Sequence, residues 1–376
     1  MLENIYLDHN ATTPVLGDAL IAVNTSLLLN GNASSIHYFG RQARTTVENA
    51  RENVANLVGA APSEVVFTSG GTESNNLALN GTERKICFAP ATEHHSVLSG
   101  VRKAFRVPVN SDGLILIDSL ETALKRASHP ALVSIMLANN ETGVIQPVRE
   151  VCELAHSYGA WVHCDAVQAL GKISCNFKNL GVDLLSISGH KIGGPQGVGA
   201  LIVREGLNLK ALNTGGGQER GRRSGTENLS GIAGFGAAAL WTLENLRDFS
   251  GFAALRDQLE YSLQEIAPIK VFGAQVARIP NTSCLTMPGV SAETQVIAFD
   301  LAGIAVSSGA ACSSGKVSDS HVLSAMGVQK KDADTAIRVS FGRGNTANHV
   351  TRFRDIWADL FQKSEHKKSQ IMALAR

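Results

Sequence analysis

The segment around Lys191 combines residue types that could support covalent chemistry on an aldehyde. Residues 184–195 read Leu-Leu-Ser-Ile-Ser-Gly-His-Lys-Ile-Gly-Gly-Pro, so the lysine follows a short apolar run among hydroxyls and glycines. An amine with the ordinary lysine pKa of about 10.4 is mostly protonated, so a lysine that condenses with an aldehyde needs a desolvated or cationic setting. Ser188 and His190 alternate with the apolar residues and could reach a phosphate. The pattern also fits a surface lysine that ends a buried strand, so other segments must decide between the two interpretations.

Asp165 is the second candidate, because it ends an apolar run. Residues 161–168 read Trp-Val-His-Cys-Asp-Ala-Val-Gln and predict a short buried strand. A protonated pyridine nitrogen would be a suitable partner for this carboxylate, since an Asp opposite it keeps the ring cationic and makes it an electron sink. The alternative is that Asp165 caps a following helix.

Gly71 and Thr72 lie where a predicted strand passes into a predicted helix. Residues 64–79 run from Glu-Val-Val-Phe-Thr through Ser-Gly-Gly-Thr into a helix-compatible stretch. Backbone N–H groups and the positive end of the helix dipole favour an anion there, and Thr72 could add a hydroxyl. The chain has no Gly-x-x-x-x-Gly-Lys-Ser/Thr motif, so this is not a P-loop, although it could be an ordinary strand-to-helix turn.

Polar clusters at residues 91–96 and 137–143 are predicted to be loops at strand ends. In an open α/β sheet such loops gather at one crevice, at the carboxyl ends of the strands. His94 could stack on a flat ring there and move protons, although a lone loop histidine is more often a solvated side chain. His94 and His95, together with His163 and Cys164, could also suggest a metal site, but their spacing matches no zinc or iron motif. We expect no metal.

Cys312 lies in a stretch of small residues. Residues 305–320 read Ala-Val-Ser-Ser-Gly-Ala-Ala-Cys-Ser-Ser-Gly-Lys-Val-Ser-Asp-Ser, without an aromatic or a large aliphatic side chain. This composition predicts a mobile loop, which would suit a thiol that visits a cofactor and then carries a group away. A free cysteine that is merely tolerated in a flexible loop is the alternative.

The order of these motifs resembles that of the cysteine desulfurases of the NifS/IscS type, in the class V aminotransferase family. The motifs are Gly-Gly-Thr-Glu-Ser-Asn-Asn, Thr-Glu-His, Asn-Asn-Glu-Thr-Gly, Asp-Ala-Val-Gln, Ser-Gly-His-Lys, Gly-Gly-Gly-Gln-Glu-Arg-Gly-Arg-Arg-Ser-Gly-Thr and Ser-Ser-Gly-Ala-Ala-Cys-Ser-Ser-Gly. The resemblance extends from residues 6–14 to residues 337–343. It implies an α/β, fold-type I pyridoxal-phosphate enzyme, with a mostly parallel seven-stranded sheet covered by helices in a large domain and a smaller α+β domain.

The resemblance also implies a cofactor, pyridoxal 5'-phosphate, and a role for each candidate residue. Lys191 would be the Schiff-base lysine, Asp165 the partner of the pyridine nitrogen, Gln168 the donor to the ring hydroxyl and His94 the stacking residue. The other cofactor-binding residues would be Gly71, Thr72, Asn140, Ser188, His190 and, from the second subunit of a homodimer, Thr226. Mild departures from the commonest family pattern occur at His9, Gly71 and His95.

The implied substrate is L-cysteine. Asn140 and Arg338 would bind it, with the guanidinium of Arg338 holding its carboxylate in a bidentate pair. Cys312 would accept the sulfur as a persulfide and release alanine. A thiol of pKa about 8.5 is little ionised at neutral pH, so the site must assist its deprotonation, and His94 is the candidate. The cysteine segment resembles the longer-loop group, whose persulfide passes to an iron-sulfur scaffold or a sulfur-carrier protein.

Composition and hydrophobic pattern agree with a two-domain enzyme. The chain has 376 residues, of which 44% are hydrophobic, and a net charge of +1, which disfavours direct nucleic-acid binding. We expect a large domain at residues 14–255 and a small domain formed by residues 1–13 and 256–376. Apolar runs alternate with amphipathic stretches between residues 65 and 203, and residues 240–266 are predicted to form one long bridging helix.

The cysteines and the N-terminus predict a cytoplasmic protein. The six cysteines lack paired spacing, which is typical of a reducing compartment. The N-terminus is acidic and too polar for a signal peptide, and no apolar run reaches the roughly 18 residues of a membrane helix.

Three other interpretations use different parts of the sequence. A pyridoxal enzyme without sulfur chemistry, such as an aminotransferase or a selenocysteine lyase, would keep Lys191 and Asp165 but give Cys312 no essential role. A nicotinamide-dependent oxidoreductase could be argued from the glycines at residues 194–199, but the full dinucleotide motif is missing. A non-catalytic assembly partner would be expected to have lost at least one of the three reactive residues. The sulfur acceptor and the selectivity for cysteine over selenocysteine stay open.

Overall fold

A seven-stranded sheet forms the centre of the larger part of the molecule. The computed structural model describes residues 4–100, 104–308 and 319–374. The strands follow the order β2-β8-β7-β6-β5-β3-β4. They are β2 (Val65–Thr68), β3 (Ile86–Pro90), β4 (Ala104–Val107), β5 (Ala131–Met136), β6 (Trp161–Asp165), β7 (Leu184–Ser188) and β8 (Gly199–Val203). Only β8 runs against its neighbours, so the predicted mostly parallel seven-stranded sheet is confirmed.

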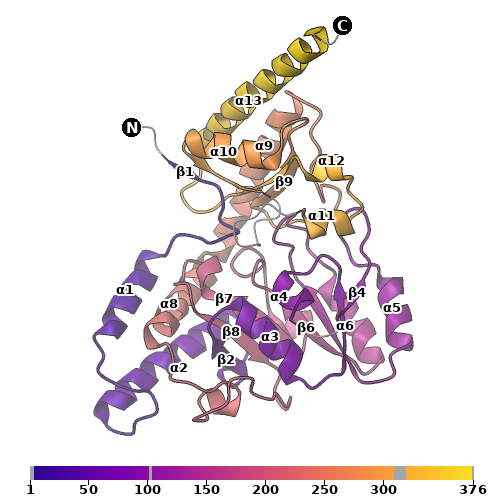
Figure 1. Cartoon of the computed structure of the whole chain (residues 1–376). Helices are drawn as coiled ribbons and strands as arrows, with labels where there is room; N and C mark the ends of the chain where they lie inside the picture. Colours follow the sequence, from indigo (N-terminus) through magenta and orange to yellow (C-terminus); the bar gives the residue numbers. More distant parts are fainter. Residues whose placement is uncertain (1–3, 101–103, 309–318, 375–376) are drawn as a thin grey trace.

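Apolar side chains cover both faces of this sheet, as a parallel sheet between helices requires. On one face the core includes Val65, Phe67, Ile135 and Ile187 and the sides of α2 (Tyr38–Val58), α6 (Val148–Ser157) and α8 (Leu229–Asn245). On the other face, Val66 packs with residues of α3 (Gly71–Gly81) and α4 (His95–Leu98). The remaining helices of this part are α1 (Gly17–Leu27), α5 (Ile117–Lys125) and α7 (Phe177–Leu180). Figure 1 shows α1, α2 and α8 together on one side and α5 at the opposite end.

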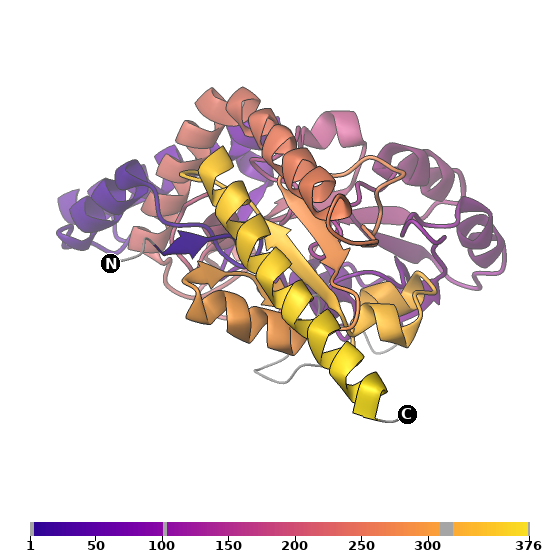
Figure 2. The same ribbon diagram turned by 90° about the horizontal axis from the view of Figure 1, so that it is seen from above.

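The smaller part has its own hydrophobic core and short sheets. An antiparallel sheet has the order β11-β12-β9, and β1 pairs in parallel with β10. The strands are β1 (Ile5–Tyr6), β9 (Thr282–Thr286), β10 (Ile304–Ala305), β11 (Ser307–Ser308) and β12 (Ala336–Ser340), and the helices are α9 (Phe252–Gln264), α10 (Ala292–Leu301), α11 (His321–Ala325), α12 (Lys330–Ala333) and α13 (Ala347–Leu374). Seen from above, α13 crosses the strands beside α9 (Figure 2). Phe299 and Phe353 stack at 4.3 Å beside the fully buried Trp357.

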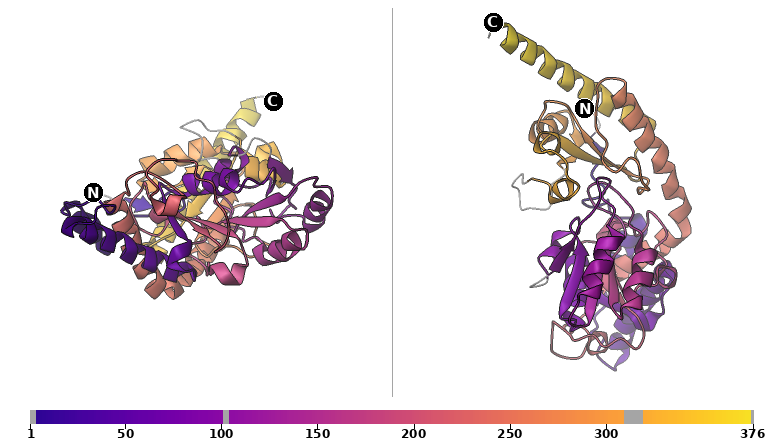
Figure 3. Two further views of the ribbon diagram at one scale, coloured as in Figure 1. Left: turned by 90° about the horizontal axis from the view of Figure 1, so that it is seen from below. Right: turned by 90° about the vertical axis from the view of Figure 1, so that its right-hand side faces the viewer.

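The prediction of one helix over residues 240–266 is wrong. The chain forms α8 from Leu229, then a 3₁₀ segment (Leu246–Gly251), then α9. Ser250 and Gly251 favour helix weakly, and the two helices serve different cores: α8 packs on the sheet, whereas Leu259 and Leu263 of α9 pack in the smaller part. Figure 3 shows this connection running along the side of the molecule.

The domain boundaries at residues 13 and 255 stay predictions. The two separate hydrophobic clusters are consistent with them, because Ile5 and Leu7 of the N-terminal segment lie in the cluster of the smaller part. No helix among the described residues combines the length and apolar character needed to cross a membrane.

Candidate active site at the carboxyl edge of the sheet

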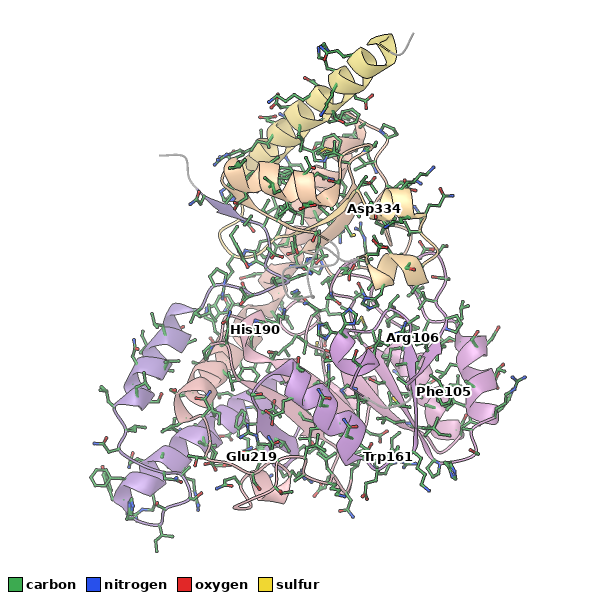
Figure 4. All side chains as sticks on the ribbon, viewed as in Figure 1. Phe105, Arg106, Trp161, His190, Glu219 and Asp334 are labelled. Carbon is green, nitrogen blue, oxygen red and sulfur yellow. The ribbon has the colours of Figure 1, made fainter. Side chains whose placement is uncertain are left out.

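One cavity of about 290 Å³ brings together most of the predicted site residues. It lies at the edge where the parallel strands end and where the smaller part meets the sheet. The predicted residues that line it are Gly71, Thr72, His94, Asn140, Asp165, Gln168, Ser188, His190, Lys191 and Arg338. His190 lies at this junction in Figure 4. Residues that come after five different strands therefore face the same space.

Lys191 reaches the cavity from a 3₁₀ turn (Gly189–Lys191) that directly follows β7. Its Nζ donates to the carbonyl oxygens of Asn10, at 2.5 Å, and Ala11, at 2.9 Å. The chain turns sharply beyond the lysine because Gly193 adopts a φ of +86°, a conformation that other residues rarely take. Burial, with the nearby Lys191 charge, lowers the pKa of His190 to about 4, so His190 is neutral at physiological pH.

Asp165 ends β6, as predicted, and its carboxylate is held by neutral donors. Oδ2 accepts from Asn75 Nδ2 at 2.6 Å, and Oδ1 accepts from the backbone N–H of Val167 at 3.0 Å. Turns follow β6 rather than a helix, so the helix-cap alternative for Asp165 is wrong. Asp165 is 7% exposed and lines the cavity, which places a buried carboxylate where a cationic ring nitrogen could meet it.

His94 caps the short helix α4 with its ring. Nδ1 accepts from the backbone N–H of Ser96 at 3.1 Å and lies 2.7 Å from Ser96 Oγ. In the neutral ring the proton is therefore assigned to Nε2. Burial lowers the pKa of His94, with a further contribution from Lys191, against the opposing effect of Asp165. Nε2–H of the neutral ring can donate a hydrogen bond, whereas the acceptor nitrogen Nδ1 is already engaged with Ser96, so this geometry favours stacking over deprotonation of a thiol.

The start of α3 contributes Gly71 and Thr72 to the cavity lining. Gly70 has a φ of +152°, and a Cβ at Gly71 would lie 2.7 Å from a methyl group of Val167. The chain therefore passes close to the turn after Asp165 only because a glycine is present. Glu73, in the first turn, is occupied by the N–H of Ser69 at 2.7 Å and by Arg223 at 2.9 Å, so its charge is partly neutralised.

Arg338 enters the cavity from β12 of the smaller part. Its Nη1 donates to the carbonyl of Asn140 at 2.9 Å, and Nη2 pairs with Asp8 at 2.7 Å. Its Nε is buried without a hydrogen-bond partner within the described part of the chain. The guanidinium is thus held at both Nη atoms, and these two bonds use two of its five N–H donors.

Among the predicted residues that the structure describes, Thr226 does not line this cavity. Thr226 is exposed, on the segment between the 3₁₀ turn Glu219–Gly221 and α8. The buried Glu219 anchors that segment through a bidentate pair with Arg51. In Figure 4, Glu219 lies far from His190. Cys312 lies outside the described residues.

Sequence reasoning missed Asn10 and Asn75. Asn75 is the neighbour of Asp165 described above. Asn10 provides the acceptor for Lys191, and its Nδ2 donates to Thr282 Oγ1 at 2.9 Å and to the Asn140 carbonyl at 3.3 Å. Both occur within quoted motifs, so the signal was their position in the motif rather than their residue type.

His163 and Cys164, which are neighbours on β6, contact other buried side chains on opposite faces of the sheet. His163 is fully buried, with Nδ1 2.8 Å from Ser134 Oγ and Nε2 2.9 Å from Ser186 Oγ. Cys164 packs in the apolar core on the opposite side of the strand. Across residues 4–100, 104–308 and 319–374, no three His, Cys, Asp or Glu side chains are grouped so that they could hold a metal ion.

Comparisons with known proteins agree on one family. The aminotransferase class-V model matches residues 5–353. A cysteine desulfurase IscS from Dictyoglomus turgidum is 40% identical, covering 96% of each chain, and a cysteine desulfurase from Cereibacter sphaeroides is 42% identical, covering 94% of this chain and 95% of its own.

Solved structures extend this agreement to the fold. A NifS-like protein from Rickettsia africae superposes with a TM-score of 0.88 at 36% identity, over 96% of this chain and all of its own. SspA, solved in complex with cysteine, gives a TM-score of 0.78 at 30% identity, over 90% of this chain and 98% of its own. The chain therefore belongs to the class V aminotransferase family and, within it, to the cysteine desulfurases of the NifS/IscS type.

Proposed function

We propose that the cavity binds pyridoxal 5'-phosphate and L-cysteine, and that Cys312 takes up the sulfur. The observation that supports this most strongly is the meeting of Lys191, Asp165 and His94 at one strand edge, with Arg338 reaching in from β12. These groups offer an amine, an anion, a flat ring and a guanidinium, which are the donors and acceptors that this cofactor and an amino acid require.

The residues present fit the cofactor. Asp165 would pair with the ring nitrogen, because its carboxylate faces the cavity while amide donors hold it in place. The glycine-opened start of α3, with Thr72, Ser188 and His190, would hold the phosphate. When bound, the cofactor supplies a sink for the electron pair left at the substrate α-carbon.

Different residues of the protein would then bind L-cysteine, take its α-proton and accept its sulfur. Arg338 would bind the substrate carboxylate, with the carbonyl of Asn140 and Asp8 orienting the guanidinium. Lys191 Nζ would hold the cofactor through its aldehyde group and would be the base for the substrate α-proton. The thiolate of Cys312 would attack the substrate sulfur: the C–S bond breaks, an S–S bond forms on the enzyme, and the carbon skeleton takes up protons and leaves as alanine. The persulfide would pass to an iron-sulfur scaffold or a sulfur-carrier protein.

We propose that the enzyme acts as a homodimer. Thr226 is exposed and does not line the cavity of its own chain, so a phosphate contact from it would come from a second copy. Apolar side chains are exposed along α1 and the segment that leads to α2, namely Leu20, Ile21, Leu27, Leu28, Ile36, Tyr38 and Phe39. Such a patch on a globular chain is typical of a protein interface.

We place the enzyme in the cytoplasm. The five cysteines within the described residues are all free thiols, which suits a reducing compartment.

The test of the proposed function compares the wild-type protein with Cys312→Ala. Both are supplied with pyridoxal phosphate, L-cysteine and a thiol reductant, and sulfide and alanine are measured. Wild type is expected to form the two products in equal amounts, whereas the variant forms little of either while retaining the absorbance band of the bound cofactor. Equal activity of the two proteins would show that Cys312 is not the acceptor.

A further inference from the structure

A second lysine, Lys172, lies buried directly behind the cavity. It is 5% exposed and belongs to the turns that follow Asp165. Its Nζ donates to Asn10 Oδ1 at 2.6 Å and to Gln168 Oε1 at 2.9 Å. Lys172 does not line the cavity that holds Asp165; it lines a second cavity, of about 260 Å³, on the other side of Lys191.

The surroundings of Lys172 favour a neutral amine. None of the described Asp or Glu side chains forms an ion pair with it, and burial lowers the pKa of Lys172 well below its usual value, with further contributions from Lys191 and Arg338. A neutral amine has two N–H donors, and the structure provides two acceptors. The two hydrogen bonds of this amine hold the side chains of Asn10 and Gln168 in place.

Lys172 and the Asn10 carbonyl together fix the direction in which the amide of Gln168 points. The Gln168 Nε2 donates to the backbone carbonyl of Asn10 at 2.9 Å, and a carbonyl can only accept. The amide oxygen faces Lys172 for the same reason, because the amine donates to it. This orientation leaves the second N–H of Gln168 for the cavity that the residue lines.

Lys172 also holds the side chain of Asn10, the residue whose backbone carbonyl accepts from Lys191. Asn10 Oδ1 accepts from Lys172, and the backbone oxygen of Asn10 accepts from Lys191 Nζ at 2.5 Å. The Asn10 side chain also donates from Nδ2 to Thr282 Oγ1 at 2.9 Å, but its Oδ1 accepts its shortest hydrogen bond from Lys172, with Asn281 Nδ2 at 3.3 Å. Two of the groups that surround Lys191 thus share one buried amine.

We propose that Lys172 is a positioning residue, whose amine fixes the Gln168 amide so that it donates to the ring hydroxyl of the cofactor and fixes Asn10 so that its carbonyl holds Lys191. This inference rests on the proposed function, because it assumes that the cavity binds pyridoxal phosphate. A purely structural cross-link would affect stability alone, whereas a positioning residue affects which cofactor the cavity prefers.

The test is the preference of the cavity for the ring hydroxyl. Dissociation constants are measured for pyridoxal phosphate and for its 3-O-methyl analogue, which cannot form an anionic ring oxygen. Wild type is expected to prefer pyridoxal phosphate by roughly 10- to 100-fold, the range for one hydrogen bond to a charged group. Lys172→Met should lower this preference to within about 3-fold, because the Gln168 amide then loses the donor to its oxygen and keeps only its bond to Asn10, whose side chain Lys172 no longer holds.

Two comparisons isolate the effect. Lys178→Met removes an exposed lysine from the same stretch of chain and should keep the wild-type preference. Gln168→Ala should lose the preference, and adding Lys172→Met to it should change nothing further, because both act through one hydrogen bond. If Lys172→Met fails to fold, the ratio of the two dissociation constants is measured for Lys172→Gln instead. This variant keeps an N–H donor and should retain part of the preference for pyridoxal phosphate.

Each outcome has a definite meaning. A Lys172→Met or Lys172→Gln protein that keeps the full wild-type preference, when Gln168→Ala has lost it, overturns the inference. A wild-type protein without any preference overturns it as well. A wild-type protein that binds neither compound refutes the proposed function instead, so the two failures are distinguishable.

Discussion

Replacing Glu219 by glutamine should strongly destabilise the protein. The side chains of Glu219 and Arg51 are 3% and 7% exposed and are joined by two hydrogen bonds of 2.8 and 2.9 Å. Glu219 Oε2 also accepts from the backbone N–H of Phe67 at 2.9 Å. A glutamine can keep one oxygen in place, but its NH₂ group would then face an N–H of Arg51, and the buried guanidinium would lose its main counter-charge.

The expected loss follows from the partners that remain. Removing one member of a buried ion pair costs about 3–5 kcal/mol, because the other charge stays buried. Arg51 Nε keeps Glu48 at 3.1 Å, but that carboxylate is half exposed and compensates only in part. We therefore expect a loss of about 3 kcal/mol in the free energy of unfolding.

The assay is urea unfolding of the apoprotein at fixed protein concentration, followed by tryptophan fluorescence. The matched control is Glu153→Gln, which breaks the exposed pair with Arg149 and should change stability by less than about 0.5 kcal/mol. Adding Arg51→Met to Glu219→Gln should recover stability, since it removes the stranded charge. A loss below about 1 kcal/mol for Glu219→Gln would refute this account of the pair. Under the proposed function, the same variant should also retain the cofactor less well, because Glu219 anchors the segment that carries Thr226, the proposed phosphate contact in a homodimer.

Two further predictions concern substrate binding and pH. Arg338→Lys keeps the charge but loses the planar donor group, so the KM for L-cysteine should rise roughly 10-fold or more in alanine-release assays, and an unchanged KM would contradict the role of Arg338. Full burial lowers the pKa of His163 to about 4 from 6.5, so the unfolded chain binds more protons between these values and acidification favours unfolding. When the pH falls from 6.5 to 4, the free energy of unfolding, measured with urea, should therefore decrease by about 3 kcal/mol less in His163→Asn than in wild type. His9 and His190, whose pKa values are also lowered, contribute to the pH dependence of stability equally in both proteins. If the free energy of unfolding has the same pH dependence in wild type and His163→Asn, His163 is not responsible for the loss of stability in acid.

The strand ends of the site were predictable because their signal is local. A short apolar run that stops at Asp165 or just before Lys191 locates a strand end within a few residues, and parallel strands bring such ends to one edge. The grouping at the cavity followed from that rule, and the family resemblance added Arg338 from a distant strand. The roles of these residues and of Cys312 stay predictions.

The contacts that support the site were not predictable from the sequence. Lys172 bonds to Asn10 across 162 positions, and Arg338 pairs with Asp8 across 330. Neither pairing leaves a periodic or compositional trace. The break between α8 and α9 was missed for a related reason: both halves have helical apolar patterns, but they face different cores.

The use of the N-terminal segment in the cavity has a consequence for how the enzyme is made. Asp8 and Asn10 leave the ribosome long before their partners Thr282, Arg338 and Ser340, which follow 272 or 330 positions later in the chain. The sheet with Asp165 and Lys191 can form on the nascent chain, but the acceptor that holds Lys191 is locked only after β12 has been synthesised and has paired with β9. Cofactor capture is then a late event in biogenesis, and a ribosome-stalled chain that ends before β12 should fold its sheet without retaining pyridoxal phosphate.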